Sequence, residues 1–124
     1  MSADFLASMA AASAGRAQRA RQLRPEAALR DFVALLPPPV PLRLSDQGFD
    51  LIAELKMRSP AEGSLQATGG ADIAQRVRAY AAAGAAAVSV LTEPSRFDGS
   101  MGHLEKAARA LVDTAVPVMR KDFL

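Results

Sequence analysis

The spacing of hydrophobic positions predicts two helices at the start of the chain. Apolar residues recur at helical intervals in residues 3–22 and again in residues 26–36, after a boundary at Pro25. The segment "PPPVP" at 37–41 then ends the helical pattern, because proline lacks the backbone N–H that a continuing helix needs. We therefore expect a helical segment followed by a stiff connector.

The pattern then changes to short apolar runs that alternate with helical segments. Continuous apolar runs indicate strands buried on both faces, and helices between such strands require parallel pairing through crossover connections. Asp72 is a candidate N-cap of the first of these helices, and Gly84 is its candidate C-terminal stop. The predicted strands are "DLIAEL" (50–55), "AAVSVL" (86–91) and "VPVMR" (116–120), and the predicted helices are 72–84 and 103–114.

This alternation of strands and helices predicts an α/β fold. Its repeat length suits either a doubly wound sheet or one sector of a (β/α)8 barrel, and periodicity alone does not choose between them. The chain has 124 residues, whereas a closed (β/α)8 barrel typically has about 250. No helix follows the third strand to cover it, so we expect an incomplete domain, or half of an assembly, with open apolar edges.

Composition and charge argue against several classes of function. The net charge is +2 and the arginines are scattered, so the chain lacks the clustered basic face of a nucleic-acid-binding protein. It has no cysteine for a disulfide or a thiolate metal site, which is compatible with a reducing cytoplasm, and His103 has no paired ligand, so we expect no metal site. No apolar run reaches the roughly 18 residues of a membrane span.

Polar residues that suit catalysis follow each predicted strand. Glu54, Lys56 and Ser59 follow the first strand, "TEPSRFDGS" (92–100) follows the second, and "RKDF" (120–123) follows the third. In parallel α/β folds these carboxyl ends lie at one edge, where active sites form. The convergence of three strand ends therefore predicts a functional site.

Lysine usage points to the same place. The chain has 12 arginines but three lysines, and two of those lysines, Lys56 and Lys121, lie at strand ends. A lysine amine exchanges protons more readily than a guanidinium, which favours proton transfer or anion binding. The alternatives are structural: a local Glu54–Lys56 ion pair, a solvated turn at "RKD", a Phe97 that fastens its loop to the core, and a tight turn in which Gly99 supplies a positive φ.

Three blocks of the sequence resemble a known family. "IAELKMRSPAEG", "AYAAAGAAAVSVLTEPSRFDGS" and "PVMRKDFL" are similar, in order and spacing, to the first three strand segments of indole-3-glycerol phosphate synthase. The resemblance implies an incomplete (β/α)8 TIM barrel. It places a helical extension and Pro-rich connector at 1–48 and the first part of the barrel at 49–124.

The resemblance also implies a function. The family closes an indole ring on 1-(2-carboxyphenylamino)-1-deoxyribulose 5-phosphate, with loss of carbon dioxide and water, in tryptophan biosynthesis and without cofactor or metal. By resemblance, Lys121 is the general acid, Glu54 an active-site carboxylate and Lys56 a contact to the anionic substrate. Ser59 is a polar substrate-binding residue, and Phe97 and Phe123 lie beside the aromatic ring of the substrate.

Two other functions stay open beside this cytoplasmic lyase. One is a non-catalytic half-barrel that acts as an interaction module and self-associates through its open edges. The other is a second phosphate-binding barrel such as phosphoribosylanthranilate isomerase, although the "E-x-K-x-x-SP" and "RKDF" blocks favour the synthase. The expected partner is a phosphorylated small molecule, with no nucleic acid and no membrane, and we expect the 124-residue chain by itself to be inactive.

Overall fold

The structure, a computed structural model, describes residues 3–65 and 73–123. The chain forms two compact units. The first unit runs to Pro38 and includes the segment from Asp122 onward, and the second unit runs from Pro39 to Lys121. The boundary that the sequence places between residues 48 and 49 stays a prediction about domain organisation.

The first unit contains the two predicted helices, α1 (Ala3–Leu23) and α2 (Glu26–Ala34). Pro25 stands at the N-cap of α2. Its lack of an N–H costs no hydrogen bond there, because the N–H groups at the start of a helix have no partner within the helix. Within α2, Arg30 donates to Glu26 at 2.6 Å, the favourable order for an ion pair one helical turn apart. Both helices are therefore confirmed.

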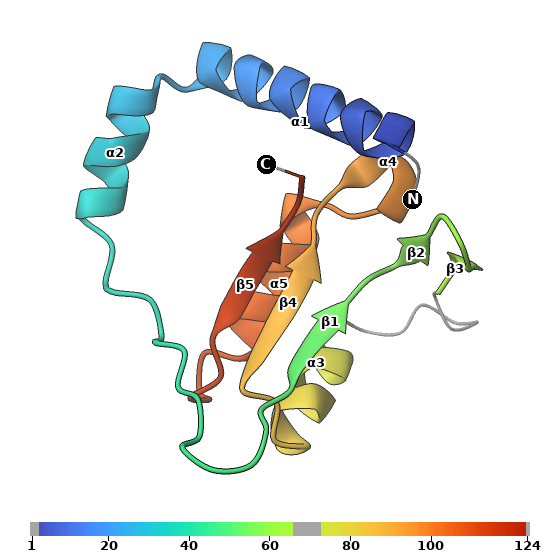
Figure 1. The fold of residues 1–124 in the computed structure, drawn as a ribbon. Coiled ribbons are helices and arrows are strands. Elements are labelled where there is room, and N and C mark those ends of the chain that lie inside the picture. Colours follow the sequence, from blue (N-terminus) through green and yellow to red (C-terminus); the bar gives the residue numbers. More distant parts are fainter. Residues whose placement is uncertain (1–2, 66–72, 124) are drawn as a thin grey trace. The chain divides into compact units, whose positions relative to one another are not determined.

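The second unit is a parallel three-stranded sheet with two helices on one face (Figure 1). Its strand order is β1-β4-β5, so each crossover helix returns the chain to the neighbouring strand. The predicted α/β alternation with parallel strand pairing is thus confirmed for these three strands. The elements are β1 (Ile52–Leu55), α3 (Ile73–Ala82), β4 (Ala87–Leu91), α5 (Met101–Ala110) and β5 (Val118–Lys121).

Two short elements were not expected from the sequence. An antiparallel hairpin of β2 (Arg58–Ser59) and β3 (Gly63–Ser64) follows β1, and the four-residue helix α4 (Pro94–Phe97) follows β4. Elements of two to four residues are too short to show a hydrophobic period. Both lie in segments that the sequence marks as polar strand ends.

The ends of the helices follow local chemistry. Gly84 has φ +95° and ends the segment after α3 as predicted, while the candidate N-cap Asp72 lies outside the described residues. The second helix begins at Met101 rather than at residue 103, because the Ser100 hydroxyl accepts the N–H of His103 at 3.1 Å as an N-cap. It also ends at Ala110, earlier than the expected residue 114.

The core lies between the sheet and the two helices α3 and α5. All five residues of β4 are buried, as a continuous apolar run predicts for a central parallel strand. Val88 and Val90 point toward the helices, where they meet residues of both helices and of β1. The buried cluster is Leu55, Met57, Ile73, Val77, Val88, Val90, Ala107 and Leu111.

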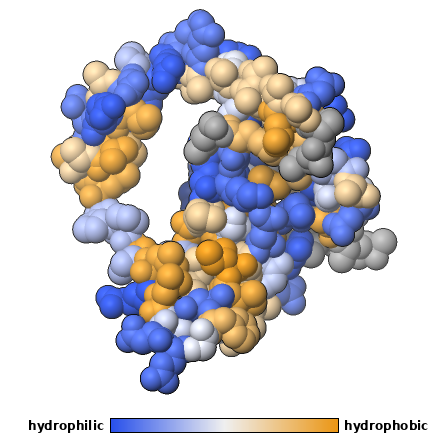
Figure 2. Space-filling model, viewed as in Figure 1, coloured by the Kyte–Doolittle hydropathy of each residue, from blue (hydrophilic) through white to orange (hydrophobic). Residues whose placement is uncertain are grey.

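Among the described residues of this unit, no helix covers the opposite face of the sheet, here called the inner face. Because side chains alternate along a strand, Ile52 and Met119 lie on this face in register with Ala87 and Ser89. Ile52 is 47% exposed and Met119 is 45% exposed. Figure 2 shows hydrophobic surface near the start of the strands and hydrophilic surface nearer their carboxyl ends.

This exposure predicts that the 124-residue polypeptide self-associates when it is studied by itself. In the described part of the chain, β1 and β5 are edge strands, and the exposed apolar side chains of Ile52 and Met119 on the inner face favour pairing with another chain. We expect the sedimentation coefficient and the midpoint of urea unfolding to rise with protein concentration.

Matched variants distinguish association through the inner face from non-specific hydrophobic association. Ile52→Gln combined with Met119→Gln should weaken the concentration dependence, whereas Val112→Gln should leave it unchanged. Val112 is 73% exposed but lies in the turn after α5. A sharp monomeric transition at every concentration would show that the inner face does not drive association.

Candidate functional site

Three charged side chains meet at the carboxyl ends of the strands. Glu54 lies in β1, Lys56 follows β1, and Lys121 is the last residue of β5. The Nζ of Lys121 is 3.2 Å from Oε2 of Glu54, and the Nζ of Lys56 is 3.5 Å from Oε1. One carboxylate therefore pairs with two lysines from separate strand ends.

The strand register explains how Glu54 reaches Lys121. Glu54 is paired with Ser89 of β4, and Ser89 is paired with Met119 of β5, so all three share the inner face. Two neighbouring strand spacings separate β1 from β5 by about 10 Å. Because Ser89 is small, the glutamate and lysine side chains can meet across β4.

The local ion pair expected from the alternative interpretation is present, but it is only part of the arrangement. Glu54–Lys56 is local, whereas Glu54–Lys121 joins residues on two strands that β4 separates. The side chains of Glu54 and Lys56 are about 30% exposed and that of Lys121 is 51% exposed. Pairs this open to water contribute about 0–1 kcal/mol to stability, so a bound anion can exchange for the glutamate at little cost.

Ser59 closes the turn of the hairpin that follows β1. Its side chain is buried, at 8% exposure, and its hydroxyl accepts the N–H of Ala61 at 3.4 Å. Gly63 has φ +75°, which the hairpin turn requires, and the N–H of Leu65 bonds to the carbonyl of Met57 at 2.8 Å. Ser59 thus orders the loop beside Lys56, with its hydroxyl turned to the loop backbone.

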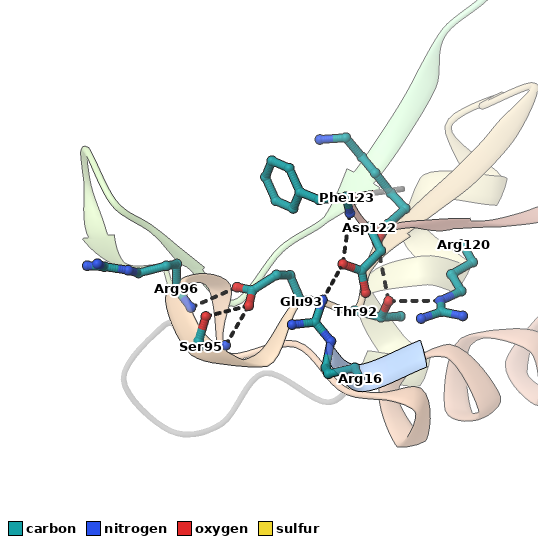
Figure 3. A network of polar contacts seen from close by, with 9 residues as sticks. Arg16, Thr92, Glu93, Ser95, Arg96, Arg120, Asp122 and Phe123 are labelled. Carbon is teal, nitrogen blue, oxygen red and sulfur yellow. Dashed lines mark hydrogen bonds and ion pairs between the residues drawn. The ribbon is translucent and has the colours of Figure 1, made fainter. Parts of the chain in front are cut away.

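Phe97 is held by a tight loop after β4. Glu93, fully buried, caps α4 by accepting the N–H of Ser95 at 2.9 Å and that of Arg96 at 2.7 Å (Figure 3). The loop closes with the N–H of Gly99 on the carbonyl of Glu93 at 2.9 Å. Phe97, the last residue of α4, is half-buried.

The expectation that Gly99 supplies a positive φ is wrong. Asp98 takes the left-handed conformation instead, with φ +52°, a region that aspartate tolerates better than most residues. Gly99 is required for another reason: a Cβ at this position would lie 2.4 Å from the carbonyl oxygen of Leu91. The turn therefore needs glycine for space.

The segment after Lys121 belongs to the first unit. There Arg16 of α1 forms a 2.8 Å ion pair with Asp122, whose side chain is 2% exposed (Figure 3). Phe123 donates its N–H to Asp122 at 2.8 Å, and its ring packs edge-on against Phe5 with centroids 6.3 Å apart. The structure thus brings Glu54, Lys56 and Lys121 together, and it places Phe123 with α1.

Sequence reasoning missed two buried polar residues, Thr92 and Glu93. The signal for Glu93 was present, because proline directly after it marks the first position of a helix and makes the preceding acid a natural cap. Thr92 has no such signal, since its hydrogen bonds reach a residue 29 positions away. Both residues lie between the strand β4 and the loop that carries Phe97.

His103 stands apart from any metal cluster. Among the described residues, no group of three or more His, Cys, Asp or Glu side chains is arranged to hold a metal ion. His103 lies in the first turn of α5, and its Nδ1 is buried. Burial lowers the pKa of His103 below its usual 6.5, and the neighbouring Lys106 charge lowers the pKa further.

No helix in the described ranges is long and apolar enough to cross a membrane.

Comparison with known proteins gives one consistent family. The family model described as "Indole-3-glycerol phosphate synthase" matches residues 8–124. "Indole-3-glycerol phosphate synthase 2" of Streptomyces coelicolor is 42% identical over 97% of this chain and 45% of its own length. The enzyme of the same family name from Methanopyrus kandleri is 49% identical over 65% of the chain and 31% of its own length.

A third relative, "Indole-3-glycerol phosphate synthase" of Leifsonia xyli subsp. xyli, aligns along the whole chain. It is 38% identical over 100% of this chain and 47% of its own length. The chain therefore spans less than half the length of these relatives.

The lowered pKa of His103 predicts a pH-dependent stability. Below pH 6.5 the unfolded histidine takes up a proton that the folded one resists, so the contribution of His103 to folding falls as the pH drops from 6.5 toward its folded pKa. We expect the free energy of unfolding to decline less between pH 7.5 and pH 5.5 in His103→Gln than in the wild type, by urea unfolding at one protein concentration.

Lys106→Gln is the matched control, because it removes the second cause of the lowered pKa. It should reduce the pH dependence without abolishing it. An identical pH profile for the wild type and His103→Gln would contradict this assignment.

Proposed function

Because the chain belongs to the indole-3-glycerol phosphate synthase family, we propose that it supplies the first three strands of a (β/α)8 barrel of that activity. The reaction closes the indole ring of 1-(2-carboxyphenylamino)-1-deoxyribulose 5-phosphate and releases carbon dioxide and water. The single observation that carries the proposal is the meeting of Glu54, Lys56 and Lys121 at the carboxyl ends of the strands. In a β/α barrel this is the catalytic face.

The reaction requires a general acid and an anion-binding group at the same site. The ring closes when an aryl carbon attacks a ketone carbon, and the ketone oxygen must gain a proton as the bond forms. Loss of the carboxylate as carbon dioxide then restores the aromaticity of the ring, and loss of a hydroxyl as water completes the indole. A positioned general acid typically accelerates such a step by 10²–10⁴-fold.

Lys121 is proposed as that general acid. Its side chain is 51% exposed and its Nζ lies 3.2 Å from Oε2 of Glu54, so the ammonium can donate a proton while the carboxylate keeps it oriented. Arginine at this place would hold the same charge without a readily transferred proton. Glu54 is proposed as the carboxylate partner that also stabilises positive charge as the ring closes.

Lys56 and Ser59 are proposed to bind the substrate. Lys56 is less exposed than Lys121 and lies on the other side of the Glu54 carboxylate, where a substrate carboxylate can replace the glutamate as its partner. Ser59 is proposed to act by ordering the loop next to Lys56, since its hydroxyl closes the hairpin turn.

Phe97 and Phe123 are proposed as the aromatic wall for the substrate ring. Phe97 is half-buried at the end of α4, and Phe123 follows Lys121 by two residues. An aromatic wall would hold the aryl carbon against the ketone and so raise the effective concentration of the two reacting atoms.

The remaining parts of the reaction are assigned to the rest of a complete barrel. The phosphate site and further catalytic groups would come from β/α units that this chain does not contain, since it spans 45% of the Streptomyces coelicolor relative. By family membership, the enzyme needs no cofactor or metal and acts in the cytoplasm in tryptophan biosynthesis. The three relatives all bear the synthase name, which favours this function over phosphoribosylanthranilate isomerase.

The test uses a complete barrel, made by continuing the chain with the carboxyl-terminal remainder of the Streptomyces coelicolor relative. Turnover of the carboxyphenylamino sugar is followed by indole fluorescence. We expect Lys121→Arg to lower kcat by roughly a hundredfold or more with a much smaller change in KM, because it removes a general acid and keeps the charge.

Lys106→Arg is the control, because Lys106 is exposed on α5, away from the strand ends. Lys106→Arg should leave kcat and KM nearly unchanged. Equal, slight effects of both substitutions would remove Lys121 from the mechanism, and turnover of an isomerase substrate alone would overturn the proposed function.

A further inference from the structure

Thr92 holds the last carbonyl of β5 with two hydrogen bonds. It is the residue directly after β4, and it is buried at 4% exposure. Its backbone N–H donates to the carbonyl oxygen of Lys121 at 2.9 Å, and its hydroxyl donates to the same oxygen at 3.3 Å. A single residue thus clamps the backbone of the proposed general acid.

The Thr92 hydroxyl is also engaged from the other side. Nε of Arg120 donates to Thr92 Oγ1 at 3.1 Å. The hydroxyl therefore accepts from the residue before Lys121 and donates to the carbonyl of Lys121 itself. Donation to the Lys121 carbonyl sets the direction of the hydroxyl proton, and the lone pairs of Oγ1 then accept from the guanidinium.

These two hydrogen bonds from Thr92 to Lys121 lie at the end of β5. β5 ends at Lys121, and terminal residues of a strand open more readily than its centre. The next residue, Asp122, already belongs to the first unit. The backbone of Lys121 sets where its long side chain starts, and hence whether Nζ stays at 3.2 Å from Glu54.

We propose that Thr92 is a positioning residue for Lys121: its hydroxyl keeps the end of β5 closed, so that the Lys121 ammonium stays beside Glu54. This inference rests on the general-acid role proposed for Lys121. Thr92 does not touch the reacting atoms in this mechanism and acts through the backbone of Lys121. Loss of its hydroxyl should therefore impair the chemical step more than substrate binding.

Two substitutions at this position isolate the hydroxyl. Thr92→Val has nearly the same shape and cannot accept from Arg120 or donate to Lys121, whereas Thr92→Ser keeps the hydroxyl and loses a methyl group. In the complete barrel described above, we expect Thr92→Val to lower kcat about tenfold with KM nearly unchanged, because misplacement of a catalytic group by a fraction of an ångström slows the reaction. Thr92→Ser should recover most of the activity.

Thr114→Val provides a matched control for general destabilisation. The Thr114 hydroxyl also donates to a carbonyl, that of Leu111, at 2.7 Å, and it accepts the N–H of Val116. It lies before the start of β5, at the end far from Lys121. Thr114→Val should lower stability and leave kcat unchanged.

A second measurement reads the position of Lys121 without turnover. The amines of the same proteins are acetylated with limiting reagent, and the rates at Lys121 and Lys106 are compared by mass spectrometry. Pairing with Glu54 protects Lys121, so Thr92→Val should raise the ratio of Lys121 to Lys106 labelling severalfold, and Thr92→Ser and Thr114→Val should not.

The two measurements separate this inference from the proposed function. If the wild-type barrel does not turn over the carboxyphenylamino sugar, the function is wrong, and the labelling ratio still decides whether Thr92 holds Lys121. An unchanged labelling ratio in Thr92→Val would overturn the inference, as would a loss of kcat that Thr114→Val shares equally.

Discussion

The parallel pairing of β4 with both of its neighbours is the contact on which the second unit depends. β4 bonds to β1 on one edge and to β5 on the other, and every one of its residues is buried. Val88 and Val90 fix the helices α3 and α5 on one face, while Ser89 leaves room for charged side chains on the other. The core and the candidate site thus lie on opposite faces of the same short strand. The register of β4 with its neighbours determines which residues lie on each face.

The register has an electrostatic consequence at the strand ends. Two lysines face one glutamate, so the three groups carry a net positive charge where the strands terminate. The chain otherwise supplies most of its positive charge as arginine. A partly solvated cluster of this kind attracts an anionic ligand and keeps its lysines oriented before the ligand arrives, since each lysine already holds a carboxylate.

The order of the main elements was predictable because long hydrophobic patterns determine it. The apolar run of β4 and the Gly84 stop after α3 are encoded locally, and alternation along β1 and β5 places Glu54, Lys56 and Lys121 on one face. The hairpin β2–β3 and the helix α4 were not predictable, because they are shorter than any periodic signal.

The polar contacts around the site escaped sequence reasoning for a different reason. The proline after Glu93 marks it in the sequence as a helix cap, but its complete burial is not visible there, because α4 has four residues and shows no hydrophobic period. The hydroxyl of Thr92 is explained only by the carbonyl of Lys121, which the fold brings next to it. Gly99 was likewise expected to supply a positive φ. The structure shows instead that glycine is needed because a Cβ would collide with the carbonyl oxygen of Leu91.

The loop after β4 is anchored at its two ends and open in the middle. Glu93 is buried at one end and Gly99 at the other, and a backbone bond joins them, while Pro94, Ser95 and Arg96 are exposed between them. Exchange of the exposed residues would leave both anchors in place, whereas a change at Glu93 would remove the cap of α4 and a side chain at Gly99 would collide with the carbonyl of Leu91. Selection for a new ligand at these strand ends would therefore find its variation in the middle of this loop.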